Sequence, residues 1–188
     1  MRLFLLSVFS LFWSGLALAA PVKWDANGHY YEFVNTRVTY HKASAAAASS
    51  VFEGVTGHLV TITSEAERLF LDALNPRDRD IWLAASDRET EGVWKWIEGP
   101  EAGTVFYTVL GGAEEYENWH RNEPNDWRTG EDYAEGWWRG DTWNDVKARN
   151  RNRYIIEYSV TQVPLGGSLP LLLTGFGGLA LIRRLKTK

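Results

Sequence analysis

Residues 123–145 read EPNDWRTGEDYAEGWWRGDTWND, a stretch rich in both carboxylates and Trp. The wider window 114–145 holds ten Asp or Glu residues against three Arg residues, together with five of the ten Trp residues. A solvated acidic tail is poor in aromatic residues, so we expect this window to be packed, with its carboxylates brought together around a cation. Because the donors are oxygen atoms of Asp, Glu and Asn, without Cys or clustered His, the pattern indicates Ca²⁺.

Charge is distributed unevenly along the 188 residues, whose net charge is −4. All 24 acidic residues and 15 of the 20 basic residues lie between Lys23 and Glu157, so this segment has a net charge of −9. An acidic segment of this kind argues against nucleic-acid binding, which needs Lys and Arg clustered on the working face to neutralise phosphates. The absence of cysteine excludes disulfides, thiolate zinc sites, iron–sulfur clusters and a cysteine nucleophile.

Residues 1–19 are expected to be a signal peptide. Arg2 precedes an apolar run from Leu3 to Phe12, and the small-x-small triplet Ala17-Leu18-Ala19 predicts cleavage after Ala19. A retained N-terminal anchor is the alternative, although the apolar run is short for a membrane span.

Residues 161–188 are expected to comprise a linker, an apolar sorting or transmembrane segment and a basic tail. The apolar block ends at Ile182 and is followed by four basic residues, which would stay on the cytoplasmic side and leave the acidic middle facing outward. The approach Val163-Pro164-Leu165, the marginal span and the basic tail resemble bacterial PEP-CTERM sorting signals, here in a Val-Pro-Leu variant. The resemblance implies an exosortase-type processing enzyme and release to the cell surface or matrix, and a plain tail anchor is the alternative.

Residues 22–160 are expected to form one α+β domain. The Ala-rich stretch 41–54 favours a helix stopped by Gly54 and Gly57. Ser64-Glu65-Ala66-Glu67 is a capping box, which predicts a second helix ending near Asn75.

Strands are predicted at 58–62, 81–84, 93–97 and 154–158. Two early helices followed by strands favour antiparallel pairing over alternating βαβ units. Between Gly99 and Glu131 lie 31 residues with little periodicity, and a segment of this kind is usually functional or disordered.

Six short segments occur in the order and approximate spacing of a C-type lectin-like domain. They are Gly57-His58-Leu59-Val60-Thr61-Ile62 through Glu67, Ile81-Trp82-Leu83-Ala84, Glu123-Pro124-Asn125, Gly130-Glu131-Asp132, Trp143-Asn144-Asp145 and Tyr154-Ile155-Ile156-Glu157-Tyr158. The chain from about Lys23 to Tyr158 therefore resembles this family. The resemblance implies a double-loop fold with two helices, small antiparallel sheets and paired terminal strands, whose long loop holds the sugar-binding calcium.

The resemblance implies a principal calcium site made of Glu123, Asn125, Glu131, Asn144 and Asp145. Ca²⁺ can exceed sixfold coordination, so such a cage leaves positions for two vicinal sugar hydroxyls. The carboxylates of Glu123 and Glu131 would accept hydrogen bonds from these hydroxyls, and the amides of Asn125 and Asn144 would donate to them. The peptide bond before Pro124 is expected to be cis. A solvated acidic loop without metal is the alternative.

An auxiliary calcium site, present in some family members, is implied at Asp87, Glu91, Asp126 and Asp132. Exposed acidic residues in turns are the alternative explanation for this set. As in other extracellular modules, the affinity for calcium is expected to be weak, on the order of 10⁻⁴ to 10⁻³ M.

The sugar preference implied by the loop is mixed. Glu123-Pro124-Asn125 resembles the motif of members that bind mannose-, glucose-, N-acetylglucosamine- or fucose-type sugars through equatorial 3- and 4-hydroxyls. The following Asp126-Trp127 resembles the galactose-type loop, in which the indole stacks on the sugar. Trp127 would then narrow the range of accepted sugars or admit galactose. The alternative is that the Trp127 indole packs against the loop. Trp82, Trp94, Trp96, Trp119 and Trp143 are expected in the core.

The chain departs from the family in its missing cysteines. Family disulfides join the first helix to the last strand and tie the long loop, but Ala45 to Ala48, Tyr133, Ala148 and Ile156 occupy those neighbourhoods here. Each bridge is typically worth about 2 to 4 kcal/mol. Calcium is therefore expected to contribute more to the stability of the loop, by linkage to the folded state.

The expected function is calcium-dependent carbohydrate binding at the bacterial cell surface or matrix, with glycans or exopolysaccharide as partners. A calcium-independent protein-interaction module on the same fold is the alternative. A glycoside hydrolase using Glu123 and Glu131 as acid and nucleophile is a remote one. The sequence contains no Gly-x-Ser-x-Gly elbow, His-Glu-x-x-His helix or phosphate loop, and its four His residues are scattered, so we do not expect an enzyme.

Overall fold

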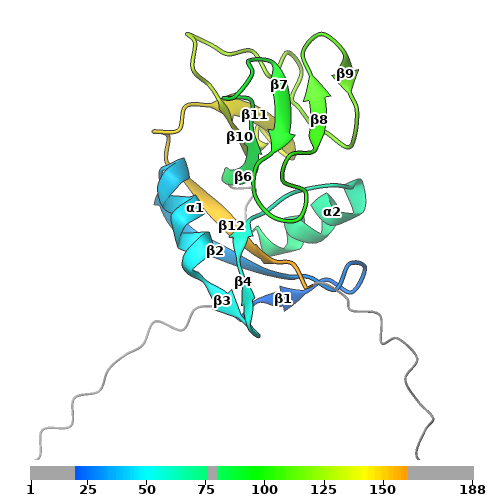
Figure 1. Ribbon diagram of the computed structural model, residues 1–188, viewed down its shortest axis with the longest axis vertical. Coiled ribbons are helices and arrows are strands. Elements are labelled where there is room, and N and C mark those ends of the chain that lie inside the picture. The colour runs from blue at the N-terminus through cyan, green and yellow to red at the C-terminus, as the bar shows by residue number, and fades with distance from the viewer. Residues whose placement is uncertain (1–19, 76–79, 161–188) are drawn as a thin grey trace, which may run out of the picture.

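The computed structural model describes residues 20–75 and 80–160 (Figure 1). The predicted signal peptide at 1–19 and the predicted sorting segment at 161–188 lie outside these residues. Within them, neither helix combines the length and the apolar composition that crossing a bilayer requires.

The two predicted helices are present. The first, α1 (Tyr40–Ser49), is shorter than the Ala-rich stretch predicts, because residues 51–56 form a hairpin instead. Strands β3 (Val51–Phe52) and β4 (Val55–Thr56) pair around Glu53 and Gly54, whose φ angles are 49° and 82°. Two successive positive φ angles are typical of the tight turn that joins antiparallel strands, so the Glu53-Gly54 turn ends the helical region earlier than expected.

The second helix, α2 (Glu65–Leu74), begins at the predicted capping box. The Ser64 hydroxyl accepts a hydrogen bond from the Glu67 amide at 3.2 Å, as expected. The Glu67 carboxylate reaches back one residue further than in the usual box and accepts from the Thr63 amide at 2.8 Å. Asn75 caps the other end, where prediction placed it.

The strands join in one mixed sheet with the path β1-β2-β12-β6-β7-β8-β9, to which β5, β10 and β11 add at the sides. Their bounds are β1 Val22–Lys23, β2 Tyr30–Val38, β5 His58–Leu59, β6 Ile81–Ser86, β7 Val93–Trp96, β8 Val105–Thr108, β9 Gly112–Ala113, β10 Tyr133–Trp138, β11 Thr142–Val146 and β12 Asn152–Tyr158. The terminal strands β2 and β12 are antiparallel partners, which confirms the expected pairing. Pairing is antiparallel throughout except between β12 and β6, which are parallel.

The predicted strand at 58–62 is reduced to its first two residues. Beyond Leu59 the backbone amide of Thr61 donates to the Glu157 carboxylate at 3.2 Å rather than to a neighbouring strand. The aperiodic stretch after Gly99 contains β8 and β9, which extend the sheet beyond β7. In Figure 1 these strands and the β10–β11 hairpin lie in one half of the molecule, away from α1 and the terminal strands.

Aromatic side chains fill the core in place of disulfides. Trp82, Trp94, Trp96 and Trp143 are buried as predicted, and Trp119 is partly buried against them. Tyr133, at one of the positions where the family carries cysteine, is buried with its ring centroid 4.1 Å from that of Tyr40 on α1. Contact between these two rings joins β10 to the first helix without a covalent bond.

Candidate metal centre

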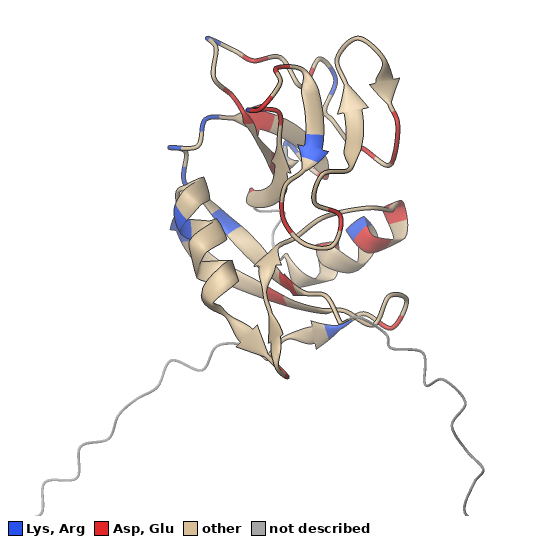
Figure 2. Ribbon diagram, viewed as in Figure 1, with Lys and Arg blue, Asp and Glu red and all other residues tan. Residues whose placement is uncertain are grey.

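Strand pairing brings three acidic segments to one end of the sheet. Tyr133 at the start of β10 pairs with Ser86 at the end of β6 and with Val146 at the end of β11. The residues next to these partners in the sequence are Asp132, Asp87 and Asp145. Three residues that lie far apart in the sequence therefore come together, and Figure 2 shows acidic residues recurring along the loops of this half of the molecule.

Asp145 anchors the loop that begins at Glu123. Its side chain is 1% exposed and accepts hydrogen bonds from the backbone amides of Asn125, at 3.0 and 3.1 Å, and of Asp126, at 2.6 Å. The Glu123–Pro124 peptide bond is cis, as expected. The Asn125 side-chain amide donates to the Glu123 carboxylate, so these two predicted ligands are in direct contact.

Carboxylates also hold the second half of the loop. The Trp127 amide donates to Glu131 Oε2 at 2.9 Å, and the Glu131 amide donates to Asp126 Oδ1 at 3.1 Å. Arg128, Thr129 and Gly130 all have positive φ angles, of 60°, 55° and 83°. The side chains predicted to bind an ion therefore also close the loop on itself.

Asn144 is held by a residue that sequence analysis did not single out. Glu135, 5% exposed on β10, lies directly opposite Asn144 in the β10–β11 ladder. Glu135 Oε1 accepts from Asn144 Nδ2 at 3.1 Å, and its Oε2 accepts from Asn152 Nδ2 at 2.5 Å. No local motif marks Glu135, because it occupies an ordinary core-facing position of β10. Only the register of the β10–β11 hairpin, which places Glu135 opposite Asn144, could have identified it.

Like charges are concentrated in this centre. Burial first, and then the charge of Asp145 and a hydrogen bond with it, raise the pKa of Glu123 to about 7. Burial and the Asp145 charge also raise the pKa of Glu131. A bound divalent cation would relieve this repulsion and favour the ionised forms.

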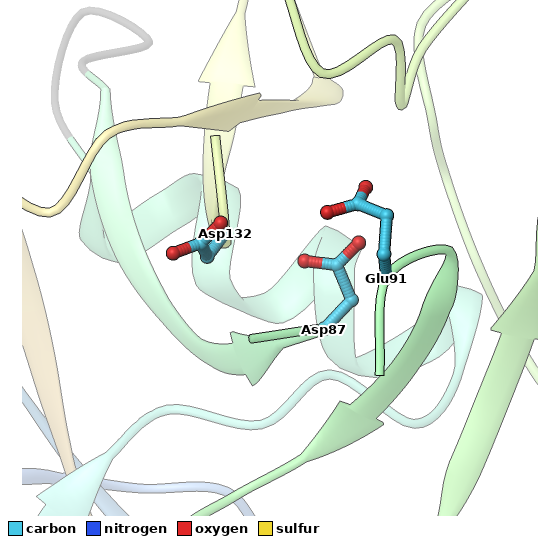
Figure 3. A group of neighbouring side chains, drawn as sticks. All are labelled: Asp87, Glu91 and Asp132. Atoms are coloured by element: carbon cyan, nitrogen blue, oxygen red, sulfur yellow. The ribbon is translucent and has the colours of Figure 1, made fainter. Parts of the chain in front are cut away.

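The predicted auxiliary residues divide into a cluster and a neighbour. Asp87, Glu91 and Asp132 each offer a carboxylate oxygen within 4.8 Å of the other two, and Figure 3 shows the carboxylates of Asp87 and Glu91 facing one another. Asp126 lies outside this group and accepts a hydrogen bond from the Glu131 amide. It is still near the cluster, because its charge is the second cause, after burial, that raises the pKa of Glu91.

Asp87 provides the clearest test of whether the cluster fits a metal. It is 3% exposed; its Oδ2 accepts from the Gly92 amide at 2.9 Å, while its Oδ1 has no partner among the described residues. Burial raises the pKa of Asp87 to about 7 despite that hydrogen bond. A buried carboxylate oxygen without a donor needs a cation or a proton, so the cluster fits a hard cation.

Trp127 is 60% exposed, with the Arg128 guanidinium carbon 4.3 Å from the centre of its ring. The indole is therefore presented on the surface of the loop, and one of its faces is partly covered by a neighbouring cation.

The fold and the chain both match known proteins. Residues 36–157 match the family model "Lectin C-type domain". The chain is 40% identical to halomucin of Haloquadratum walsbyi over 136 residues, which cover 70% of this chain and 1% of that protein. It is 30% identical to hepatic lectin of Gallus gallus over 130 residues, covering 69% of this chain and 55% of the relative. It thus spans about half of the hepatic lectin and a very small part of halomucin.

Among solved structures, the C-type lectin CEL-I of Cucumaria echinata superposes with a TM-score of 0.56 at 26% identity, covering 73% of this chain and 95% of the other. The herring type II antifreeze protein superposes with a TM-score of 0.57 at 19% identity, covering 72% and 94%, and shows the shared fold alone. The matched domain and the hepatic lectin belong to a non-enzymatic lectin family, in agreement with the expectation that this protein is not an enzyme. On the match over residues 36–157, the chain belongs to the C-type lectin family.

Proposed function

We propose that this protein binds carbohydrate through calcium held by Glu123, Asn125, Glu131, Asn144 and Asp145. The observation that carries the proposal is the loop built on Asp145, whose buried carboxylate fixes the backbone of Asn125 and Asp126. Burial, followed by the charge of Asp145, raises the pKa of Glu123 in this loop to about 7. Such an arrangement is unfavourable for a loop without a cation and favourable with one.

The side chains of this loop supply the recognition chemistry. Bound Ca²⁺ would provide coordination positions for two vicinal hydroxyls. The Glu123 and Glu131 carboxylates accept hydrogen bonds from those hydroxyls, and the amide groups of Asn125 and Asn144 donate to them. The order Glu123-Pro124-Asn125 supports a mannose- or glucose-type preference. The exposed indole of Trp127 provides an apolar face next to the loop, where it would shift that preference.

Asp87, Glu91 and Asp132 are proposed as an auxiliary calcium site, with Asp126 between the two sites. The orphaned Asp87 Oδ1 supports this assignment. A cation there would hold the end of β6 against the start of β10 and so support the principal loop.

The proposal is tested on a glycan array with the domain in calcium and after chelation. We expect binding that chelation abolishes and that the double variant Glu123→Gln with Asn125→Asp removes or redirects toward galactose-type sugars. Asp25→Asn, a fully exposed acid outside both sites, is the matched control and should bind normally. Glycan binding that survives chelation would reject the calcium mechanism, and protein capture without any glycan binding would support the calcium-independent interaction module instead.

Calorimetry gives an independent test of the metal. With an affinity on the order of 10⁻³ to 10⁻⁴ M, 10 mM calcium would stabilise the folded state by about 1.5 to 3 kcal/mol. We expect Tm of the isolated domain to rise by several degrees in calcium and to fall when a chelator is added. An unchanged Tm across millimolar calcium would contradict both metal sites.

The domain is proposed to act outside the cell, on glycans or exopolysaccharide. This rests on the expected signal peptide at 1–19 and on the PEP-CTERM-like segment at 161–188, with membrane anchoring and exosortase-type processing as part of the same proposal. N-terminal sequencing of the mature protein should begin at Ala20, and mass spectrometry of the surface-released form should show whether the C-terminal segment is removed.

A further inference from the structure

A pocket of about 340 Å³ lies beside the principal loop. Pro124, Asn125 and Asp145 form part of its lining, so it adjoins two of the proposed calcium ligands. Its volume is at the lower end of the range for small-molecule sites, about 300 to 1,000 Å³. Any group that enters this pocket from a sugar bound at the loop would be small.

The wall opposite the loop is apolar. Val93 and Trp94 line it from the start of β7, and Val109 and Leu110 line it from the turn after β8. The two segments are held side by side because Val93 pairs with Thr108 and the Val109 amide donates to the Gly92 carbonyl at 2.9 Å. Val109 is half exposed and Leu110 is fully exposed. The ladder therefore presents apolar side chains to solvent at the mouth of the pocket, where covering them with a ligand would be favourable.

The charged part of the lining is acidic. Asp87, Glu91, Asp126 and Asp145 contribute to it, and among the described residues no Lys or Arg does. Across the two proposed sites, seven carboxylates would face four positive charges from two calcium ions, which leaves a net charge of −3. An anionic group on the ligand would be repelled from this pocket, whereas a neutral apolar group would not.

We propose that this pocket is a subsite for a short O-acyl group on the sugar that binds at the principal loop, an inference that rests on the proposed function. An acyl group is neutral, carries alkyl carbons for the wall of Val93, Val109 and Leu110, and leaves the 3- and 4-hydroxyls of the sugar free for the loop. The small volume of the pocket limits the acyl group to a few carbon atoms. The protein would thus prefer acylated neutral glycans over both the unsubstituted sugar and its uronic acid form.

The test compares methyl α-D-mannopyranoside with its 6-O- and 2-O-acetyl and butanoyl esters, by titration calorimetry in saturating calcium. All keep the 3,4-diol. We expect one of the two ester series to bind more tightly than the parent, with a gain of up to about fourfold for each methylene that becomes buried. The corresponding methyl mannosiduronate should bind more weakly than the parent.

Two variants separate the subsite from the principal site. Leu110→Ser should cancel the gain from the acyl group without changing the affinity for the parent glycoside, because Leu110 is fully exposed, lines the pocket and is not a proposed calcium ligand. Leu69→Ser, at an exposed Leu on α2 outside the pocket lining, is the control and should keep the gain.

The outcomes are distinct. If the parent glycoside binds with calcium but neither ester series binds more tightly, or if the gain survives Leu110→Ser, the subsite is wrong and the proposed function stands. If the gain is found in the 6-O-ester series, tighter binding of the uronate than of the parent would also overturn the subsite, because both substituents are then carried at C6. If neither the parent nor its esters bind in calcium, the proposed function and the subsite fall together.

Discussion

Asp145 accepts the backbone amide of Asn125 through both of its carboxylate oxygens, at 3.1 and 3.0 Å. One residue is on a strand of the β10–β11 hairpin, and the other is in the loop that follows a cis proline bond. The same carboxylate is a proposed calcium ligand. Because the strand holds Asp145 and Asp145 holds the loop, this one carboxylate positions the backbone of the proposed site.

Asp145→Asn should therefore weaken the loop even without calcium. The amide that replaces one oxygen cannot accept, so one or more backbone donors of Asn125 and Asp126 lose a partner, which typically costs about 1 to 3 kcal/mol. We expect Tm of this variant in chelator to be lower than that of the wild-type domain. Calcium should raise its Tm only by the amount that the auxiliary site contributes. Thermal denaturation with and without calcium measures both effects.

The matched control is Asp25→Asn, whose side chain is 96% exposed. It should change neither Tm nor the response to calcium. If Asp145→Asn were as stable as the wild-type domain in chelator, the loop would not depend on this carboxylate.

The auxiliary site can be separated from the principal one at Asp87. Asp87→Asn removes the charge of the buried residue in the cluster with Glu91 and Asp132 but leaves Asp145 and the loop intact. We expect the calcium stoichiometry in titration calorimetry to fall from two to one, with glycan binding reduced but still present.

Glu89→Gln is the control for Asp87→Asn, because Glu89 lies in the same turn and binds Lys95 rather than the cluster. It should retain both ions. A stoichiometry of one for the wild-type domain, unchanged by Asp87→Asn, would show that the three carboxylates are exposed acids without a metal role.

The family resemblance implies the candidate ligands of this centre, whereas the contacts that support them come from the structure. The resemblance implies Asp87, Glu91 and Asp132 as auxiliary ligands, and the structure brings them together because Tyr133 pairs with Ser86. That pairing joins strands far apart in the sequence, which local periodicity cannot reveal. Asp126, expected in the same group, accepts a hydrogen bond from the Glu131 amide, a contact made across a turn whose residues 128–130 have positive φ angles.

The fold shows the same limit. Helix α2 was predictable from its capping box, whereas the end of α1 depended on a two-residue turn at Glu53-Gly54 that competes with strong helix propensity. Strand β2 has no clear alternation in burial, because its second half is largely exposed, so its pairing with β12 was expected from the family resemblance rather than from its own pattern.

Glu135 is predicted to be a positioning residue for Asn144. With Asn144 Nδ2 bound to Glu135, the carbonyl oxygen Oδ1 is the atom left to ligate calcium. In Glu135→Gln, the new amide donor would face Asn144 or Asn152. If the Asn144 side chain turned to accept this hydrogen bond through Oδ1, that oxygen would no longer be available to bind calcium. We expect a loss of about 10- to 100-fold in calcium affinity, measured by titration calorimetry.

Folding provides the discriminating readout for this variant. Burial raises the pKa of Glu135 to about 7, so near neutral pH glutamine resembles the protonated acid in shape and charge. Tm in chelator should then change little while calcium affinity falls. Glu115→Gln, at an exposed acid outside both sites, should change neither quantity. Equal losses in Tm and affinity would indicate a merely structural role for Glu135.

His29 should make the domain less stable at higher pH. Its Nδ1 lies 2.7 Å from Glu157, and this hydrogen bond raises the pKa of His29. Burial acts in the opposite direction, and the negative charges of Glu157, Glu101 and Glu67 raise the pKa further. A raised pKa in the folded state means that the stabilisation is fully present below about pH 6.5 and is lost as pH rises through the folded-state value. His29→Gln should remove this part of the dependence of Tm on pH.

The carboxylates of the metal centre should make stability depend on pH in opposite directions without and with calcium. Burial raises the pKa values of Asp87, Glu123 and Glu135 to about 7. It is also the main reason why the pKa values of Glu91 and Glu131 are raised. Between about pH 4.5 and 7 the folded state then holds more protons than the unfolded state, so the free energy of unfolding of the calcium-free domain falls as pH rises.

Calcium binds the ionised carboxylates, so protons compete with it below pH 7 and the rise in Tm caused by calcium should grow between pH 5 and 7.5. Calorimetry of the His29→Gln variant, in chelator and in 10 mM calcium across this range, isolates the contribution of the metal centre. Asp87→Asn in the same background should flatten the calcium-free curve in part, because one raised pKa has been removed. A calcium effect on Tm that stays constant from pH 5 to 7.5 would mean that these carboxylates are not the groups that bind the metal.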